Sequence, residues 1–263
     1  MEVFDVVPDK LPVTLRDFWA DSLKNPAAMA KICLEKLGAQ VISVRLDGCH
    51  PERQNRSSTQ ALDTVKSILD AVGVPVIVTG PAHFEKNNEI MKKIAAECAG
   101  ENLLLNWAES DNYRTIAGAC MGYDHCCVTR SPIDVNMAKQ LNILVTTIGL
   151  KPEKIIMDPM TGGLGYGIEY TYSVMERIRL AALSGDPMLA MPMLVTTGFE
   201  TAKAKEARAA ESENRLWGKL DSRGAFIETA AAMALLNAGA DLLIMYYPEA
   251  VQTIKSKIAE IMK

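Results

Sequence analysis

Short apolar runs alternate with longer amphipathic segments along the whole chain. Eight runs, rich in β-branched and other apolar residues, indicate strands at residues 1–7, 41–47, 75–80, 102–108, 125–130, 154–159, 192–197 and 242–247. Between them, apolar residues recur at helical spacing over residues 27–37, 58–72, 85–98, 112–121, 136–148 and from 170 onwards. The pattern therefore predicts a series of βα units.

Eight such units in a chain of 263 residues are typical of a TIM (β/α)8 barrel, for which about 250 residues is usual. We expect residues 1–263 to form a single barrel domain. A doubly wound open sheet is the alternative, because periodicity does not show whether a sheet closes. Glycines also follow four helical segments and precede strands, where left-handed helix caps are common, at Gly38, Gly73, Gly149 and Gly239.

The junction after the sixth run differs from the others. Its apolar residues end at Asp158, and residues 161–167, TGGLGYG, contain four glycines in seven positions. This loop is not a dinucleotide fingerprint, because the third glycine of that motif would fall on Ile168. Glycine allows close approach of another backbone or of a flat ligand. We therefore predict that the loop, with Tyr166 on its rim, contacts a large flat ligand.

Polar residues stand at the ends of most of the predicted strands. In a TIM barrel, functional groups lie at these carboxyl ends, and the rule selects Asp47, Gly80, Asn106, Arg130 with Ser131, Asp158, Thr196 with Thr197, and Tyr246. Such residues also serve as helix N-caps, which is the structural alternative for each. For ligand contact we favour Asn106, which can donate and accept hydrogen bonds, and Asp158, which can accept them.

Charge and composition exclude several classes of function. The net charge is -4, the pI is about 5.5 and no block of lysine or arginine occurs, so neither nucleic acid nor an anionic membrane surface is an expected partner. The first ten residues resemble no secretion signal, and no run of about 18 apolar residues occurs. We expect a cytoplasmic protein. Its six cysteines include no Cys-x-x-Cys pair, which predicts reduced thiols and no iron–sulfur cluster.

Histidines give no confident metal site. There are only three, of which His83 is the best placed and His125, at the start of a strand, is expected to be structural. The spacing Asp-x-His-x-x-Gly, which supplies the lower cobalt ligand in one class of cobalamin proteins, is absent. No metal ligand and no catalytic residue is predicted in this chain.

Four segments carry a family resemblance: residues 158–183 (DPMTGGLGYGIEYTYSVMERIRLAAL), 131–144 (SPIDVNMAKQLNIL), 203–207 (KAKEA) and 238–251 (AGADLLIMYYPEAV). They resemble the small (delta) subunit of the corrinoid iron–sulfur protein, the methyl carrier of the acetyl-CoA decarbonylase/synthase system. The resemblance extends from about Val7 to the C-terminus. It implies a barrel preceded by an N-terminal hairpin segment, which this chain is expected to lack.

The resemblance also implies a function. The family's small subunit covers a cobalamin that it shares with a large subunit, which bears the iron–sulfur cluster. The cobalt takes a methyl group from methyltetrahydropterin through a separate methyltransferase and passes it to acetyl-CoA synthase, in the anaerobic reductive acetyl-CoA pathway of carbon fixation. This chain would be a non-catalytic partner in a heterodimer. Its expected cobalamin contacts are Asp47, Asn106, Ser131, Asp158, Thr161, Gly162, Gly163, Gly165, Tyr166, Gly167 and Thr197.

An enzyme is the alternative: a stand-alone barrel similar to methyltetrahydrofolate:corrinoid methyltransferases. Such barrels hold the pterin ring with acids and an asparagine at successive strand ends. Asn106 and Asp158 stand at suitable ends, whereas Gly80 occupies a place where an acid would be expected.

Overall fold

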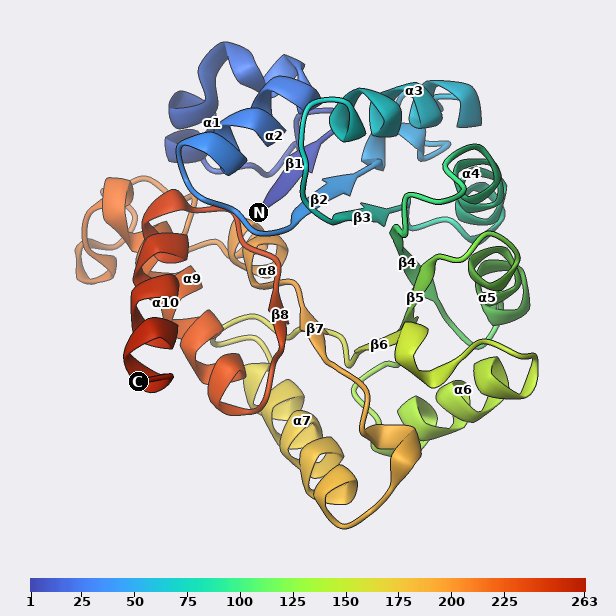
Figure 1. Cartoon of the computed structure of the whole chain (residues 1–263). Helices are drawn as coiled ribbons and strands as arrows, with labels where there is room; N and C mark the ends of the chain where they lie inside the picture. The colour runs from blue at the N-terminus through green and yellow to red at the C-terminus, as the bar shows by residue number, and fades with distance from the viewer.

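The computed structural model describes residues 1–263 and shows parallel strands in a ring, surrounded by helices (Figure 1). The strands are β1 (Glu2–Phe4), β2 (Ile42–Arg45), β3 (Val76–Thr79), β4 (Leu104–Ala108), β5 (Cys126–Arg130), β6 (Ile155–Asp158), β7 (Leu194–Val195) and β8 (Leu242–Leu243). The first six form one parallel sheet in chain order, and β7 pairs in parallel with β8.

Backbone hydrogen bonds close the two remaining seams. Between β6 and β7, the Met157 N–H donates to the carbonyl of Pro192 at 2.8 Å, and Met157 forms a parallel bridge with Met193. Between β8 and β1, the Glu2 N–H donates to the carbonyl of Met245 at 3.2 Å. The predicted TIM barrel is therefore confirmed, and the open sheet is not formed.

Every strand is followed by at least one helix. The helices are α1 (Val13–Trp19), α2 (Pro26–Glu35), α3 (Ser58–Leu69), α4 (Phe84–Glu97), α5 (Tyr113–Gly122), α6 (Val135–Thr147), α7 (Ile168–Leu183), α8 (Thr197–Lys203), α9 (Leu220–Asn237) and α10 (Pro248–Ile261). Six of them match predicted segments closely. The structure adds α1, α8, α9 and α10. Of these, α8 and α9 both lie between β7 and β8, and residues 204–219 connect them.

Local sequence signals explain where several helices begin and end. Ser57 and Gln60 form a reciprocal capping box at the start of α3. Of the four predicted glycine caps, Gly38, Gly149 and Gly239 have positive φ angles of 62°, 108° and 103°. The prediction is wrong for Gly73, which does not adopt positive φ; α3 ends at Leu69 with Asp70 as its C-cap.

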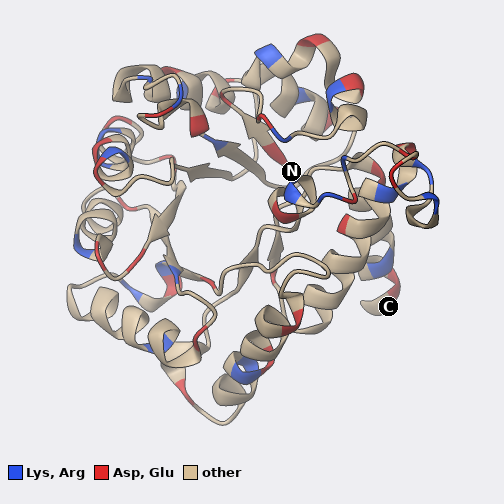
Figure 2. Ribbon diagram, turned by 180° about the vertical axis from the view of Figure 1, so that it is seen from behind, with Lys and Arg blue, Asp and Glu red and all other residues tan.

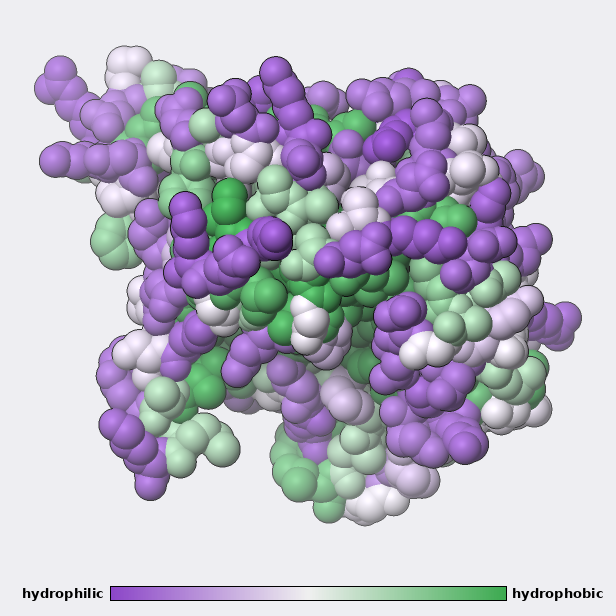
Figure 3. Space-filling view, turned by 45° about the horizontal axis from the view of Figure 1, so that its top comes forward, coloured by the Kyte–Doolittle hydropathy of each residue, from purple (hydrophilic) through white to green (hydrophobic).

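The core has an outer and an inner part. The larger hydrophobic cluster packs the helices against the outside of the sheet, and a smaller one inside the barrel contains Ile77, Val128, Leu194 and Ile244. Charged residues lie mainly on the surrounding helices and loops (Figure 2). Hydrophilic residues cover most of the face seen in Figure 3, where hydrophobic ones gather in a central recess. No helix combines the length and the apolar character needed to cross a bilayer.

Candidate functional site at the barrel mouth

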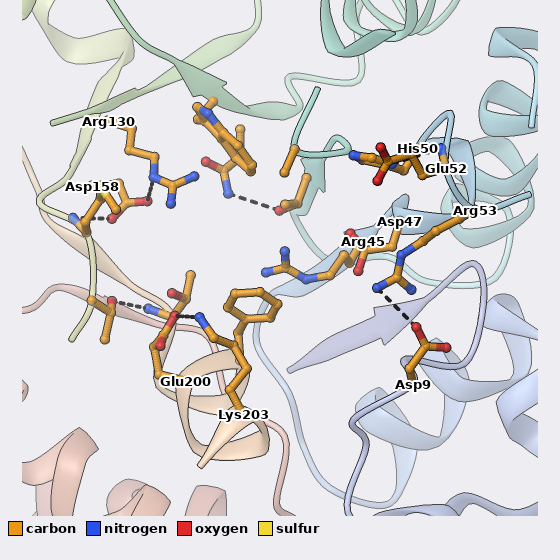
Figure 4. Close-up of a pocket in the computed structure, with 18 residues that line it drawn as sticks. Asp9, Arg45, Asp47, His50, Glu52, Arg53, Arg130, Asp158, Glu200 and Lys203 are labelled. Carbon is orange, nitrogen blue, oxygen red and sulfur yellow. Dashed lines mark hydrogen bonds and ion pairs between the residues drawn. The ribbon is translucent and has the colours of Figure 1, made fainter. Parts of the chain in front are cut away.

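A polar cavity of about 580 Å³ opens at the carboxyl ends of the strands (Figure 4). Residues from the β1 to β7 units line it, so it lies where TIM barrels place their functional groups. Its lining comprises Asp9, Arg45, Asp47, His50, Glu52, Arg53, Thr79, Ala82, Asn106, Trp107, Arg130, Asp158, Met160, Thr161, Thr196, Phe199, Glu200 and Lys203.

One half of the mouth, beside β1 and β2, is fully paired. The Arg45 guanidinium is bonded to Glu2 through its Nε at 2.8 Å. The same carboxylate accepts hydrogen bonds from Ser43 Oγ at 2.9 Å and from the Tyr246 hydroxyl at 2.7 Å. The ring of Phe199 lies 4.1 Å from Arg45 Cζ. We call Glu2, Ser43, Arg45 and Tyr246 the paired half of the mouth, although only Arg45 of the four lines the cavity itself.

The opposite half, beside β4 to β6, leaves polar atoms without partners. Asn106 is 2% exposed, and its Nδ2 donates to Thr79 Oγ1 at 3.0 Å while its Oδ1 has no partner. Turning the amide over would leave the nitrogen unpaired instead. Arg130 Nε is also buried without a hydrogen bond, since Glu109 and Asp158 lie at 3.7 and 3.8 Å. We call Asn106, Arg130 and Asp158 the unpaired half.

Burial raises the pKa values of the two acids beside Arg130. Desolvation raises the pKa of Asp158 above its ordinary value, although Arg130 and the Met160 N–H, which donates to its Oδ1 at 2.9 Å, partly oppose this. Desolvation also raises the pKa of Glu109, against the attraction of Arg130. The Arg130 guanidinium is stacked on Trp107, with Cζ 4.2 Å from the ring centroid. A ligand group that offers one donor and one acceptor would complete this half.

Ion pairs line the rim. Arg53 lies 3.6 Å from Asp9, and Lys203 lies 2.9 Å from Glu200 on α8 (Figure 4). A second cavity of about 660 Å³ adjoins the first across Trp107 and Arg130, and His83 lines it. No group of three or more His, Cys, Asp or Glu side chains is placed to hold a metal ion.

The structure brings some of the predicted contact residues together and separates others. Asp47, Asn106, Asp158 and Thr161 line the mouth cavity, as do the strand-end residues Arg130 and Thr196. The remaining predicted contacts do not line it: Ser131, Gly162, Gly163, Gly165, Tyr166, Gly167 and Thr197. Ser131 and Thr197 are buried, and the Thr197 hydroxyl donates to the backbone of Ile244 at 3.3 Å.

The glycine loop is a compact turn that is bonded mainly to itself. The N–H groups of Tyr166 and Ile168 both donate to the carbonyl of Gly163, at 2.9 and 3.2 Å. A Cβ on Gly162 would overlap the carbonyl of Gly167, so close backbone approach explains this glycine. Tyr166 is 60% exposed, and its hydroxyl donates to Glu206. Thr161 alone joins the loop to the cavity, where its Oγ1 accepts from the Thr196 N–H at 2.8 Å.

The side chains of His125 and His83 both accept backbone hydrogen bonds. His125 is buried, its Nδ1 accepts from the Leu103 N–H at 3.1 Å and its Nε2 lies 3.0 Å from the carbonyl of Ala95, so the structural interpretation is confirmed. His83 is the N-cap of α4, where its Nδ1 accepts from the Lys86 N–H at 3.3 Å.

The strand-end rule missed several residues that line the cavity, including Arg45, Trp107 and Lys203. Arg45 carried a usable signal, because it precedes Asp47 by two positions and alternation places both side chains on one face of the strand. Lys203 lies in a segment, KAKEA, that resemblance had already singled out.

A family model described as CO dehydrogenase/acetyl-CoA synthase delta subunit matches residues 1–255. The chain belongs to this family. The acetyl-CoA decarbonylase/synthase complex subunit delta of Methanopyrus kandleri is 38% identical over 254 residues, which cover 96% of this chain and 62% of the relative. That of Methanocaldococcus jannaschii is 34% identical, with 97% and 62% covered. The chain thus spans about three fifths of the length of these delta subunits.

Solved structures support the fold of this delta-family chain. Dihydropteroate synthase of Xanthomonas albilineans superposes with a TM-score of 0.62 at 15% identity, covering 99% of this chain and 92% of the other. The Coxiella burnetii dihydropteroate synthase in complex with pteroic acid gives 0.60 at 12% identity, covering 99% and 92%. At these identities the likeness establishes a shared barrel and no more.

Proposed function

We propose that this chain is the small subunit of a corrinoid iron–sulfur methyl carrier and that its barrel mouth covers a corrinoid shared with a large subunit. Membership of the delta family supports a role in the acetyl-CoA decarbonylase/synthase system. The observation that carries the proposal is the unpaired half of the mouth, where Asn106 Oδ1 and Arg130 Nε are buried without partners. Buried polar atoms are normally hydrogen-bonded, so this half favours a ligand that supplies the missing groups.

A corrinoid fits these residues chemically. Its ring carries amide side chains, which offer both N–H donors and carbonyl acceptors, as Asn106 and Arg130 require. The cavity of about 580 Å³ is the size of a pocket for one small ligand. A corrin ring with its side chains is larger, so this mouth would hold only part of it and a second protein surface would cover the rest.

The chain's own contribution in this proposal is to bind, orient and shield. Trp107 and Phe199 supply apolar walls, and the paired half keeps Arg45 fixed at the edge. Covering one face of the corrinoid removes water from it. When bound, the corrinoid would carry the methyl group from methyltetrahydropterin, delivered by a methyltransferase, to acetyl-CoA synthase in the reductive acetyl-CoA pathway. A non-catalytic role and a cytoplasmic location belong to this proposal.

Pterin binding by the barrel itself is the second candidate. The cavity volume favours it, because a pterin would fit inside entirely, and Asn106, Arg130 and Asp158 could pair with the edge of its ring. One of the dihydropteroate synthases of the same fold was solved in complex with pteroic acid. In that case the chain would act as a pterin-binding methyltransferase-like barrel.

Calorimetric titration under anaerobic conditions separates the two candidates. We expect cobalamin to bind weakly to the isolated chain and much more tightly when the large subunit is present. Tight binding of cobalamin by the isolated chain would contradict a shared site. Strong binding of methyltetrahydrofolate, with no effect of the large subunit on cobalamin affinity, would replace the carrier proposal by the pterin one.

A further inference from the structure

A second unpaired arginine lies outside the mouth cavity. Arg223, in the second turn of α9, is 4% exposed, and none of its three guanidinium nitrogens has a hydrogen-bond partner. No carboxylate lies within ion-pair distance of it, whereas Arg45 has Glu2 and Arg130 has Glu109 and Asp158. Arginine keeps its charge in proteins, and an isolated buried charge is unfavourable. Arg223 therefore requires an acceptor that the chain does not supply.

The polar groups near Arg223 are donors as well. The ring of Tyr247 lies against the backbone of Gly224, so closely that a Cβ there would overlap the phenol oxygen. That oxygen and Thr14 Oγ1 are both buried without hydrogen-bond partners. Burial raises the pKa of Tyr247 to about 12, although Thr14 partly opposes the shift, so the phenol keeps its proton and can donate. Arg223 thus offers donors only, and the hydroxyls of Tyr247 and Thr14, which can also accept, are able to donate beside it.

Carboxylates of the chain serve the helix starts beside Arg223 and not Arg223 itself. At the start of α9, the Leu220 N–H donates to Glu211 at 2.8 Å. Before α10, the N–H groups of Tyr246 and Tyr247 both donate to Glu228 at 2.7 Å. The guanidinium of Arg223 is therefore the group in this region that still lacks an anion.

The ring that covers Arg223 is not closely stacked on it. Trp217, in residues 204–219, lies 6.0 Å from Arg223 Cζ. In the closely stacked pairs Arg45–Phe199 and Arg130–Trp107, the corresponding distances are 4.1 and 4.2 Å.

We propose that Arg223, together with Tyr247 and Thr14, binds a carboxylate group beneath residues 204–219. The fork of a guanidinium matches the two oxygens of a carboxylate. A monoanion suits the site better than a dianionic phosphate, because Glu228 and Glu249 also act on Tyr247 and only one cation is present. None of the three residues lines the mouth cavity, so this site does not depend on the proposed corrinoid function.

The carboxylate can come from a free small acid or from an acidic side chain or chain terminus of a partner. Two arms of one experiment distinguish these sources. The first titrates the isolated chain with sodium acetate and uses sodium chloride at equal ionic strength as the reference. The second adds the large subunit. Both follow the melting temperature and the NMR signal of the Arg223 Nε–H.

In the acetate arm we expect a saturable rise of several degrees in melting temperature and a shift of the Nε–H signal. Arg223→Met should abolish both responses, and without acetate it should melt no lower than the wild type, because the unpaired charge is gone. Arg215→Met, which changes an exposed arginine of the covering segment, should respond as the wild type does. Arg223→Lys should respond weakly, since it keeps the charge but loses the fork.

Phosphate at the same ionic strength should raise the melting temperature less than acetate. If acetate has no effect but the large subunit shifts the Nε–H signal, and Arg223→Met weakens that complex while Arg215→Met does not, the carboxylate belongs to the partner. A wild-type Nε–H signal that neither acetate nor the large subunit moves overturns the proposal. So does an acetate response that Arg223→Met retains in full.

Discussion

The two halves of the barrel mouth use the same kinds of side chain for different purposes. In the paired half, Glu2 accepts hydrogen bonds from Ser43, Arg45 and Tyr246, so every strong group there is satisfied within the chain. In the unpaired half, Asn106 and Arg130 each keep a buried polar atom without a partner. Polar residues at strand ends are therefore not equivalent. Their hydrogen bonds distinguish a group that is satisfied within the chain from one that is not, and we propose that the second kind contacts a ligand.

The difference predicts opposite responses to substitution. Removing a residue of the paired half leaves a buried charge or hydrogen-bond donor without its partner. The free energy of unfolding is then lowered. Removing Asn106 of the unpaired half takes away an oxygen that nothing in the chain satisfies, so stability should change little while binding is lost. The experiments below follow this contrast from the largest expected effect to the smallest.

Glu2→Ala should have the largest effect. It leaves Arg45 buried without its carboxylate, and loss of one partner of a buried pair costs about 3–5 kcal/mol. At about 2–4 °C per kcal/mol, the melting temperature should fall by on the order of 10 °C, as calorimetry would measure. Glu153→Ala, at an exposed glutamate, is the control. Equal melting temperatures for the two variants would remove the distinction between the halves.

Asn106→Leu should show the reverse pattern. The free energy of unfolding should change by less than about 1 kcal/mol, because the lost bond to Thr79 is offset by removal of the unpaired Oδ1. Affinity for the corrinoid in the presence of the large subunit should fall about tenfold to a hundredfold, equivalent to about 1–3 kcal/mol. Asn136→Leu, on an exposed face of α6, should leave affinity unchanged. A destabilised Asn106→Leu with full affinity would assign Asn106 to the paired half.

Gly165→Val tests the glycine loop, which lies outside both halves. Gly165 has a φ of 77° and open space around it, so a β-branched residue should cost about 1–3 kcal/mol through backbone strain alone. The melting temperature should drop by several degrees, while corrinoid affinity of the folded protein stays at the wild-type value. Gly73→Val, where φ is not positive, should be tolerated. Reduced corrinoid affinity in Gly165→Val would show that the glycine loop is part of the binding site.

Asp158 should give the smallest effect, a dependence on pH. Burial raises its pKa above the ordinary 3.8, so the folded protein binds this proton more tightly than the unfolded chain. Between the raised value and 3.8, its contribution to stability should increase as pH falls and be lost as pH rises. Corrinoid affinity should change in the opposite sense and weaken as pH falls, because the protonated acid accepts less well. Asp158→Asn should remove the pH dependence of both stability and corrinoid affinity. Asp63→Asn, which changes an exposed aspartate, should leave both pH dependences as in the wild type.

The sequence predicts the fold well because each strand and helix leaves a local signal. The eight short apolar runs predict the eight strands, and six helices lie within a few residues of their predicted segments. Closure is not local. It depends on contacts such as Glu2 with Met245, which join opposite ends of the chain and leave no periodic trace. Closure places the carboxyl ends of the strands around one mouth. The strand-end rule selected Asp158, which is the last residue of β6, and Asn106, which lies in the middle of β4.

The glycine loop shows why the rest could not be predicted. Two of its glycines, Gly165 and Gly167, adopt positive φ angles, which glycine permits. Composition does not say what approaches a glycine, and at Gly162 the approaching atom is the loop's own Gly167 carbonyl. The pairing of Arg45 with Glu2 was equally hidden, because 43 residues separate them in the chain. Only their positions in space distinguish a satisfied group from an unpaired one.

The most direct measurement of the central claim is a crystal structure, grown anaerobically, of this chain with its large subunit and bound corrinoid. We expect the corrinoid between the two proteins, with its amide side chains within about 3.2 Å of Asn106 and Arg130, the usual hydrogen-bond limit, and no direct contact with Gly165. A corrinoid on another face of the barrel, or a mouth filled only by water in the complex, would contradict the account.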